Sequence, residues 1–498
     1  MIGRSTSIHQ AAIRRIRIII IMWALCSLTH FYVRTSAQSI ESEWSDPLTL
    51  SALTGVTGWD PKISSDRSGT VHVIWGAWFG SEPPGAQAAN RIIYTRLVDG
   101  IWSEPLDILI SPTPDDQLFI GDLSVSPSGL LVVSWVANGQ LLISKANAES
   151  AIDAASWQTQ NIDSQSTRPL VAIDKQNDHW FVTYVKNNAF VQLIKSTDLG
   201  ATWESPVTIW SVGSENTAPF NGTAIVSDNG KLHMAWDVHD ADRSWNSIII
   251  MNASIDTTSF SNINVREVAR SGESDPTIAW PSIATDAENT VHLVWNNGVG
   301  SRIGRQYQFS SDSGITWSSI SPIHANELSG QTGNPSLAID SDQKLHLITS
   351  ARGPDNATAI RYTYLQEKEW SRYESLWPEL HPGEHPDTAV TNGNRLHLVW
   401  NDYLNGAVIY TTRELDAEWI PSTPFIDQVS YVTVPEPVKL KPQQDTANDL
   451  SNASAEPDYE FDRTANVQSM NTSRVLLFGV IPVVLLVLIA GVITLRRR

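Results

Sequence analysis

The sequence predicts an all-β protein: a seven-bladed β-propeller of four-stranded blades, followed by one C-terminal transmembrane helix. Three observations lead to this prediction. A sequence pattern recurs seven times between residues 60 and 426, the segments within each copy alternate like short β-strands, and a 21-residue run without charge lies near the C-terminus. The 498 residues are 41% hydrophobic and only 17% charged, which excludes a disordered or coiled-coil chain.

The recurring pattern has a Pro, an Asp five residues later, a short polar turn, and then a His, two apolar residues and an anchor residue. The clearest copies begin at Pro61, Pro281 and Pro335. Repetition at a fixed period indicates one supersecondary unit per copy, stacked against its neighbours. The anchors recur every 49 to 60 residues and are Trp75, Trp135, Tyr184, Trp236, Trp295, Thr349 and Trp400.

Segments such as Val71–Trp75 and Ala407–Thr411 are short, rich in β-branched residues and alternating, which is typical of strands. Four such segments in each of seven copies predict a seven-bladed propeller. Six or eight blades are the alternatives, because the copy at 222–268 lacks the tryptophan that accompanies the fourth strand elsewhere. The segment Trp44–Leu50 resembles a lone fourth strand, and we expect it to close the ring against the last blade.

The first 37 residues have the layout of a secretory signal peptide. Three arginines (Arg14, Arg15 and Arg17) precede the apolar run 18–28, and small residues around Ala37 suit a signal peptidase. An uncleaved N-terminal anchor is the alternative. Because the single cysteine, Cys26, lies in this segment, the propeller expected at 38–426 has no disulfide and depends on its core.

The C-terminal segment predicts a single-pass plasma-membrane protein with an extracellular N-terminal ectodomain. Val475–Leu495 is long enough to cross the bilayer, and the arginines at 496–498 place the C-terminus in the cytoplasm. We therefore assign 474–498 to the transmembrane helix and tail. Residues 427–473 are acidic and contain prolines, which predicts an extended stalk.

Two turns match the pattern S-x-D-x-G-x-T-W at every position: Ser196–Trp203 and Ser310–Trp317. On these residues the chain resembles the sialidase superfamily of Asp-box, or BNR-repeat, propellers, over residues 44–426. The resemblance implies that the boxes join third to fourth strands, on the face opposite the active site. Aspartate should accept hydrogen bonds from turn amides, glycine should take a positive φ, and tryptophan should enter the blade core. These structural residues are Asp198, Gly200, Trp203, Asp312, Gly314 and Trp317.

Propeller geometry predicts where a ligand site lies. Loops that enter the innermost strands share one face with loops that leave the second strands, so both sets should surround a central funnel. Carboxylates, amides, arginines and aromatics gather there, which suits a sugar, although these residues could also merely cap loop ends. The candidate ligand-binding residues are Asp60, Arg168, Trp280, Asn334, Arg352, His385 and Trp78.

Resemblance to sialidases implies an arginine triad, a tyrosine nucleophile paired with a glutamate, and an aspartate acid/base. Glycoside hydrolysis needs carboxylates, and the candidates just past second strands are Asp402, Asp237 and Asp240, with Tyr403 as the phenol. We expect Asp402 and Tyr403 to be exposed, and Asp237, at the matching place after Trp236, to behave alike. No R-x-P motif occurs near the N-terminal end of the propeller region, where that family places its first arginine.

The histidines of the repeat all occupy one slot, so we predict that they bond to nearby turns rather than bind a metal. They are His72, His233, His292, His346 and His397. We expect no cofactor and no metal, and a net charge of −19 argues against nucleic acid.

The favoured function is a membrane-anchored, monomeric ectodomain that binds an extracellular glycan. The sequence leaves open whether a bond is cleaved. An exo-acting, sialidase-like glycosidase is the first alternative, and a protein-interaction propeller is the second, because the fold itself does not fix function. Five N-x-S/T sequons permit glycosylation, at Asn221, Asn252, Asn356, Asn452 and Asn471.

Overall fold

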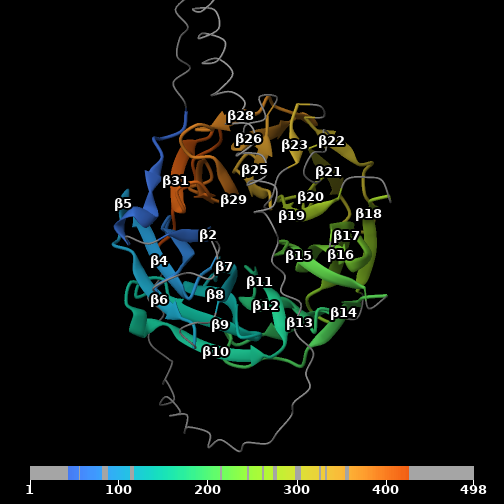
Figure 1. Cartoon of the computed structure of the whole chain (residues 1–498), viewed down its shortest axis with the longest axis horizontal. Helices are drawn as coiled ribbons and strands as arrows, with labels where there is room; N and C mark the ends of the chain where they lie inside the picture. Colours follow the sequence, from blue (N-terminus) through green and yellow to red (C-terminus); the bar gives the residue numbers. More distant parts are fainter. Residues whose placement is uncertain are drawn as a thin grey trace, which may run out of the picture. The chain divides into compact units, whose positions relative to one another are not determined.

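Seven antiparallel sheets are arranged as blades around a central axis in the computed structural model, which confirms the predicted seven-bladed propeller (Figure 1). The structure describes residues 43–425, except for 55–56, 81–87, 113–116, 214–215, 244–245, 261–262, 273–276, 298–303, 325–326, 331–333 and 354–357. The predicted signal peptide, stalk and transmembrane helix lie outside these residues. Within the described part of the chain, no helix is long and apolar enough to cross a membrane.

The first four blades follow one another along the chain, and each begins with the strand nearest the axis. Blade 1 contains β2 (Gly58–Ser65), β3 (Val71–Ala77), β4 (Arg91–Val98), β5 (Ile101–Trp102) and β6 (Leu106–Ile110). Blade 2 contains β7 (Leu118–Val125), β8 (Leu130–Ala137), β9 (Gln140–Asn147) and β10 (Gln158–Asp163). Blade 3 contains β11 (Ser166–Asp174), β12 (His179–Lys186), β13 (Phe190–Ser196) and β14 (Val207–Ser211). Blade 4 contains β15 (Thr217–Val226), β16 (Lys231–Asp240), β17 (Asn246–Asp256) and β18 (Asn264–Arg270).

The remaining blades repeat this order, and short 3₁₀ helices η1 (Leu50–Leu53), η2 (Ala154–Ser156) and η3 (Ala241–Arg243) lie between strands. Blade 5 contains β19 (Ala279–Thr285), β20 (Val291–Asn296), β21 (Arg305–Ser310) and β22 (Ser321–Ile323). Blade 6 contains β23 (Ser329–Gly330), β24 (Ser336–Ile339), β25 (Leu345–Arg352), β26 (Thr358–Gln366), β27 (Glu369–Trp370) and β28 (Glu374–Leu376). Blade 7 contains β29 (Gly383–Thr391), β30 (Arg395–Asp402), β31 (Ala407–Glu414) and the N-terminal β1 (Leu48–Thr49).

Strand β1 closes the ring, as the sequence predicts. It pairs with β31, with Leu48 opposite Tyr410, and Trp44 forms an isolated bridge to Arg413. The Trp44 indole is 5% exposed and packs edge-on against Tyr362 of blade 6. The first described residues therefore complete the last blade and join the two ends of the ring.

Tryptophan anchors fill the spaces between blades. Trp75 and Trp400 are fully buried, and Trp295 is 1% exposed. Trp75 shares a core cluster with Val399 and Val408 of blade 7, so each anchor on a second strand packs against the preceding blade. Burial of a side chain of this size contributes at least about 2 kcal/mol. Much of the unusual tryptophan content is thus packing between repeats.

The repeated histidine is a hydrogen-bonded structural residue, which confirms the prediction from its position. In blade 6, His346 Nε2 lies 3.0 Å from Asp340 Oδ2 of the preceding turn, and Nδ1 lies 2.9 Å from the Tyr362 hydroxyl. His72 and His292 have the same kinds of partner, whereas His397 uses a threonine and a tyrosine, and His233 uses two serines. No group of three or more potential metal ligands is arranged for a metal among the described residues.

The two S-x-D-x-G-x-T-W turns, which keep the name Asp-box turns here, contain hydrogen bonds to their aspartates, and their tryptophans, Trp203 and Trp317, are partly exposed. Asp312 accepts hydrogen bonds from Thr316 N at 2.7 Å and Thr316 Oγ1 at 2.6 Å, and Asp198 does the same with Thr202. Gly314 has a φ of 86° and Gly200 has a φ of 72°. The turns join third to fourth strands, β21 to β22 and β13 to β14, and the face on which they lie is called here the Asp-box face.

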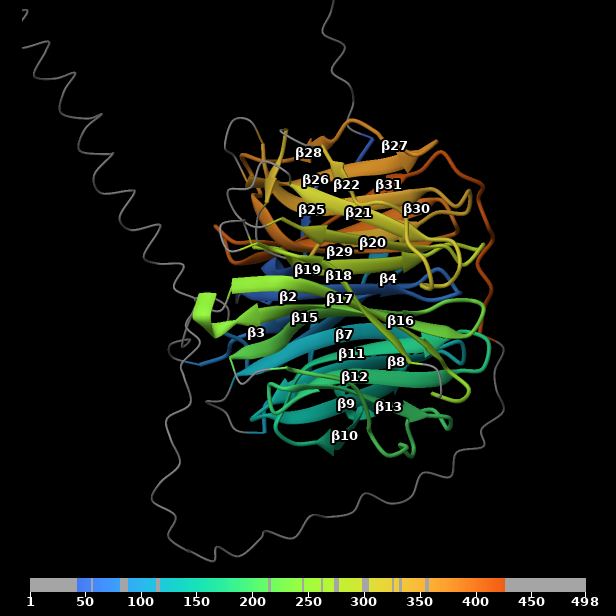
Figure 2. The same ribbon diagram turned by 90° about the vertical axis from the view of Figure 1, so that its right-hand side faces the viewer.

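Residues 415–425, called here the strap, cross the Asp-box face after β31 (Figure 2). The strap contacts the turns that join first to second strands in blades 6, 7, 1 and 2. Ile420 N donates to Asn392 O, Thr423 N donates to Arg67 O, and the Arg67 guanidinium lies 4.7 Å from the Phe425 ring centroid. The described chain therefore leaves the propeller on the Asp-box face.

Two of the five sequons lie within hydrogen-bonded parts of the blades. Asn252 is 1% exposed and its Nδ2 donates to Met234 O at 2.8 Å. Asn221 Nδ2 donates to Asp237 Oδ2 at 2.9 Å. A glycan on either amide nitrogen would break these contacts, and the other three sequons lie outside the described residues.

Candidate functional site

The innermost strands carry an irregularity near their first residues, on the face opposite the Asp-box face, called here the funnel face. Register shifts interrupt the pairing of the inner strand in blades 1, 2, 3, 4, 5 and 7. At these shifts, four non-glycine residues adopt a positive φ: Asp60 (47°), Arg168 (54°), Trp280 (52°) and His385 (51°). Such backbone costs about 1–3 kcal/mol per residue and clusters at functional sites. All four belong to the predicted ligand-binding set.

Second-strand side chains hold these bulges in place from the preceding blade. Ser134 Oγ donates to Pro169 O at 3.3 Å, and Ser350 Oγ donates to Gly383 O at 2.7 Å. Asp237 has the same role in blade 4, because its Oδ2 accepts the Trp280 amide at 3.0 Å. The strained backbone is thus fixed by contacts between neighbouring blades.

The expectation that Asp237 is exposed is wrong. Its side chain is 0% exposed and also accepts hydrogen bonds from the backbone and side-chain amides of Asn221, both at 2.9 Å. The physical reason is that Asp237 still belongs to strand β16 and its carboxylate satisfies three buried donors. Asp240, which follows it, accepts a hydrogen bond from the Asp242 amide at 2.9 Å and is partly exposed.

Asp402 is also fully buried, contrary to its expected exposure. Its carboxylate accepts hydrogen bonds from the amides of Leu404 and Asn405, from Asn405 Nδ2 at 2.7 Å, and lies 2.9 Å from His381 Nδ1. The chain turns sharply after β30, and turn amides without strand partners favour an aspartate at this position. Asp402 therefore orders the turn.

Tyr403 is exposed as expected, with 42% of its surface accessible. Burial of its ring edge and the negative charges of Glu384 and Asp402 raise the pKa of Tyr403, while the Thr358 hydrogen bond and Arg352 oppose the rise. The structure places Tyr403 in blade 7 and Asp237 and Asp240 in blade 4, on opposite sides of blades 5 and 6. The catalytic roles of these four residues stay predictions.

The inner strands of the seven blades surround the propeller axis, and the region around that axis is called here the central channel. Its layer nearest the funnel face, the upper layer, contains a charged contact between blades 7 and 1. Lys62 Nζ lies 2.6 Å from Asp60 Oδ1, and His385 Nδ1 lies 3.9 Å from the same oxygen. All three side chains are 21–25% exposed, and Trp59 packs edge-on against His385. Burial raises the pKa of Asp60, but the positive charges of Lys62, His385 and Arg168 outweigh it and hold that pKa below its ordinary value.

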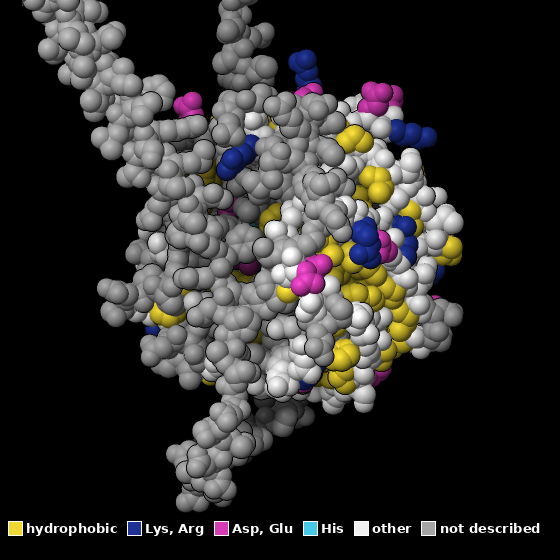
Figure 3. Space-filling view, turned by 45° about the vertical axis from the view of Figure 1, so that its right-hand side comes forward, with side chains coloured by type: hydrophobic (Ala, Val, Ile, Leu, Met, Phe, Trp, Pro, Cys, Tyr) yellow, Lys and Arg dark blue, Asp and Glu magenta, His cyan; other side chains and the backbone are white. Residues whose placement is uncertain are grey.

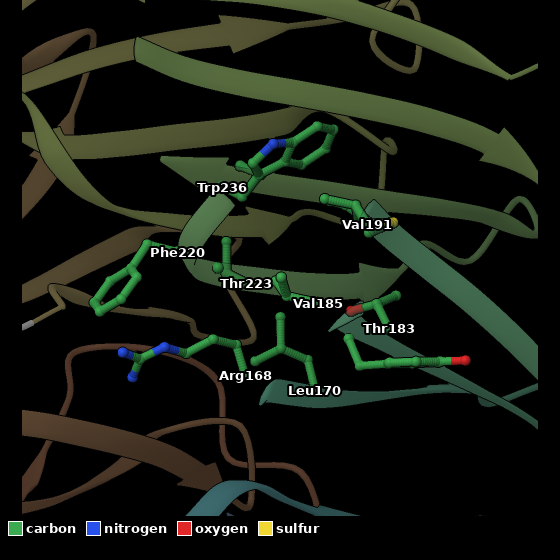
Figure 4. Close-up of a pocket in the computed structure, with 12 residues that line it drawn as sticks. Arg168, Leu170, Thr183, Val185, Val191, Phe220, Thr223 and Trp236 are labelled. Carbon is green, nitrogen blue, oxygen red and sulfur yellow. The ribbon is translucent and has the colours of Figure 1, made fainter. Parts of the chain in front are cut away.

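Arg168 lies in the same layer, on blade 3. Its guanidinium carbon lies 3.6 Å from the Phe220 ring centroid (Figure 4). The Phe220 and His239 ring centroids lie 4.1 Å apart, with the rings tilted by 30°. His239 Nε2 in turn lies 3.4 Å from Asp237 Oδ1. Burial among the blades lowers the pKa of Arg168, although the negative charges of Asp237 and Asp60 oppose this change. The side chain remains exposed to solvent. This stack connects the arginine to the buried aspartate.

A second layer lies deeper in the channel and was missed by sequence reasoning. Lys62, Asp122 and Asp387 occupy one equivalent position in blades 1, 2 and 7, opposite Ile74, Ser134 and Val399 of the second strands. All three are partly exposed. The same position in the other blades is uncharged and holds Leu170, Thr223, Ser282 and Ser336.

The two carboxylates of this layer have different surroundings. Asp387 accepts hydrogen bonds from Ile63 N and Thr388 N, both at 2.9 Å, and from Ser336 Oγ at 3.2 Å. Asp122 Oδ1 accepts one from Leu123 N at 2.8 Å. Burial, followed by the charge of Asp387, raises the pKa of Asp122 to about 7, with Lys62 opposing the rise. Burial raises the pKa of Asp387 as well, against the charge of Lys62 and its hydrogen bonds, so negative charge is disfavoured at both aspartates of this layer.

The other predicted ligand-binding residues lie at the funnel face but outside these two layers. Trp78 follows β3, Asn334 precedes β24 and Arg352 ends β25, and each is partly exposed. A half-open pocket of about 20 Å³ lies between blades 3 and 4, lined by residues that include Arg168, Met234 and Trp236 (Figure 4). It has room for about one water molecule, so a sugar ring cannot occupy it.

Comparisons with known proteins support the fold. No family model matches the chain, and no curated protein matches it. A solved structure described as a polysaccharide lyase, an ulvanlyase, has a TM-score of 0.53 at 12% identity and covers 73% of this chain and 95% of its own. A second structure of that lyase, described as bound to -[GlcA(1-4)Rha3S]-, has a TM-score of 0.52 with the same identity and coverage. The NanB sialidase from Streptococcus pneumoniae has a TM-score of 0.40 at 13% identity, covering 72% of this chain and 68% of its own. Similarity to the two ulvanlyase structures at this level supports the propeller fold and leaves function to the site.

Proposed function

We propose that this protein is a membrane-anchored, extracellular propeller of the sialidase superfamily that binds a glycan in its central channel, entered from the funnel face. The supporting observation is the set of four side chains with positive φ, Asp60, Arg168, Trp280 and His385, which four different blades hold at one level. A strained backbone at functional side chains persists only where surrounding contacts fix it, and here the preceding blades supply those contacts. By contrast, the anchors and the repeated histidines in the blade cores do not adopt a positive φ.

The chemistry of this layer suits a sugar. Trp280 and Trp59 offer aromatic rings for C–H stacking, while Asp60 and His385 offer partners for hydroxyl groups. Arg168 is an open guanidinium, which is the side chain that best binds a carboxylate or sulfate. An anionic sugar therefore fits the channel better than a neutral one. The solved structures with this fold are described as a lyase and a sialidase, which agrees with this proposal.

The strap supports a particular attachment. Its last described residue, Phe425, lies on the Asp-box face, opposite the proposed entrance. We propose an extended stalk over residues 427–473 and a membrane helix at Val475–Leu495 that anchors a monomeric ectodomain. External protease on intact cells should remove all but a small membrane-bound fragment, and full protection of the ectodomain would overturn the topology.

Binding is tested with the detergent-solubilised full chain on an array of neutral, uronate, sialate and sulfated glycans. We expect retention on anionic glycans, an affinity loss of at least about tenfold in Arg168→Ala and Trp280→Ala, and unchanged melting. Arg372→Ala and Trp419→Ala are matched controls, because both side chains are exposed away from the channel. Equal glycan binding by all four variants would contradict a channel site.

A protein-interaction propeller is the second candidate. Hydrophobic side chains gather at the outer surface of the ring (Figure 3), and Val265, Val268 and Ala269 of β18 are partly exposed there. Arg266 covers part of this surface by stacking on Trp317 at 4.3 Å. Glycan binding that requires Arg168 and Trp280 would favour the channel over this surface.

A further inference from the structure

We propose that the protein binds a small anion, chloride or a similar halide, on the buried guanidinium of Arg305 between blades 5 and 6. The contact region between two neighbouring blades is called here a seam. Arg305 belongs to β21, the third strand of blade 5, and is only 1% exposed, so this site is separate from the central channel. The inference therefore does not depend on glycan binding.

Six of the seven seams contain the same apolar contact. An aliphatic residue on the third strand of one blade shares a core cluster with the aromatic anchor of the next blade, as Val408 does with Trp75. Each aliphatic residue pairs with the residue directly after the anchor of its own blade. The six are Ile92, Leu141, Val191, Ile250, Ile360 and Val408, and all are buried.

The seam between blades 5 and 6 has polar residues at both of these positions. Arg305 pairs with Asn296, the residue directly after the anchor Trp295, so it occupies the aliphatic position. The anchor of blade 6 is Thr349, and Arg305 Nε donates to Thr349 Oγ1 at 2.5 Å. Because six seams hold together with an apolar pair, the fold does not itself require a charge here. The change at both positions of one seam indicates a specific task.

Arg305 is a buried cation without an acidic partner in the described part of the chain. Its hydrogen bonds go to two uncharged acceptors, Thr349 Oγ1 and, at 2.7 Å, Ser350 O. The Nη1 atom is buried and has no hydrogen-bond partner among the described residues. Burial lowers the pKa of Arg305 to about 9, so the guanidinium still carries its charge at neutral pH. A buried charge and a buried, unbonded donor both destabilise a fold, and an anion at Nη1 would satisfy both.

The free donor and the size of the residues favour a halide over a larger oxyanion. Carboxylates and sulfates bind arginine best through two parallel N–H groups, but Nε and Nη2 of Arg305 already donate to blade 6. A spherical ion can bind at Nη1 without that fork. Arg305 and Thr349 together also have fewer side-chain heavy atoms than any of the other six pairs, which suits an ion of atomic size.

Thermal melting of the detergent-solubilised full chain tests the site, with chloride replaced by gluconate at constant ionic strength. An ion that binds only the folded state stabilises it by mass action, so we expect melting to rise by about 2 °C or more towards about 200 mM chloride and then to level off. Arg305→Gln should abolish this rise. Arg96→Gln is the matched control and should keep it, because Arg96 also donates to uncharged acceptors of the next blade but is partly exposed.

Two further measurements keep the test decisive if Arg305→Gln folds poorly. Arg305→Leu combined with Thr349→Trp restores the apolar contact of the other seams and should melt independently of chloride. Equilibrium dialysis of wild type against radiolabelled chloride should give one bound ion per chain, and the double variant should bind none. Wild-type melting that does not depend on chloride, or an equal chloride dependence in wild type and the Arg305 variants, would overturn the proposal and leave Arg305 as a structural link between blades.

Discussion

The histidine slot and the channel layers both occupy equivalent positions around the ring, yet they differ in how their residues vary from blade to blade. The slot holds histidine in five blades, each bonded to a hydroxyl or carboxylate of its own blade, as in the His346 contacts with Asp340 and Tyr362. The deeper channel position holds a lysine, two aspartates, two serines, a threonine and a leucine. A constant residue at a repeated position indicates a structural need common to all blades, whereas a varied one is free to serve a single ligand.

Among the residues with a structural role, those in the Asp-box turns should give the largest loss of stability when changed. Gly314→Val combines a left-handed φ of 86° with a new Cβ only 2.1 Å from Ser254 Oγ. We expect a loss of about 3 kcal/mol in the free energy of unfolding and unchanged glycan preference. Gly200→Val, whose Cβ would meet Trp180, should behave alike. Urea unfolding and thermal melting measure the effect. A melting temperature unaltered by both changes would contradict a structural role for these turns.

Loss of a slot histidine should have the next largest effect. His346→Ala leaves the Asp340 carboxylate and Tyr362 hydroxyl without their buried partner, which costs about 1–3 kcal/mol for each group. Glycan affinity should be intact in the folded fraction. His292→Ala should also destabilise, but by less, because His292 and Asp286 are more exposed and 3.4 Å apart. Equal melting of both variants and wild type would contradict a structural slot.

The slot also predicts a pH dependence of stability. Burial lowers the pKa of His233 to about 4 and that of His397 to about 3, below the unfolded value of about 6.5. Below pH 6.5 the unfolded chain therefore binds more protons than the folded one, and stability falls as pH falls. The loss between pH 7 and pH 5 is about 2 kcal/mol for each histidine. Urea unfolding at both values tests this, with His397→Asn expected to reduce the difference.

Asp402 is a buried aspartate that bonds to turn amides, so it belongs neither to the histidine slot nor to the channel layers. Asp402→Asn exchanges an acceptor of several hydrogen bonds for an amide, so we expect it to lower stability by about 1–2 kcal/mol. Adding Tyr403→Phe should cost little more, because that ring is 42% exposed. Thermal melting beside glycan binding separates the contributions. A double variant that melts like wild type and yet loses binding would restore Asp402 and Tyr403 as a rim site.

Sequence predicts this fold well because its signals are local and repeated. The anchors, the alternating segments and the Asp-box turns recur at fixed places, so Trp44–Leu50 could be recognised as the strand that closes the ring. The funnel-face residues Asp60, Arg168, Trp280 and His385 were found because the repeat places them where the chain enters the inner strands, although in the structure they lie within the first residues of β2, β11, β19 and β29. Their positive φ came from contacts between blades, which no local signal shows.

The failures at the site have one physical cause, the distinction between a strand and the loop that follows it. Asp237 and Asp402 follow an anchor tryptophan and were expected in exposed loops, but both still belong to second strands and satisfy buried amides. Lys62, Asp122 and Asp387 were missed because they lie inside strands that read as core. Each of the three pairs with the residue directly before an anchor. A search for charged residues at this inner-strand position would have identified them.

The central claim, that varied channel positions bind while constant slots stabilise, is tested most directly by one pair of variants. Arg168→Ala and His346→Ala, each compared with wild type, are measured for melting temperature and for affinity toward the anionic glycan retained best on the array. We predict opposite results: Arg168→Ala keeps its melting temperature and loses affinity by at least about tenfold, and His346→Ala melts earlier with unchanged affinity. Early melting with normal binding in Arg168→Ala would show that the channel layer is structural and would contradict the account.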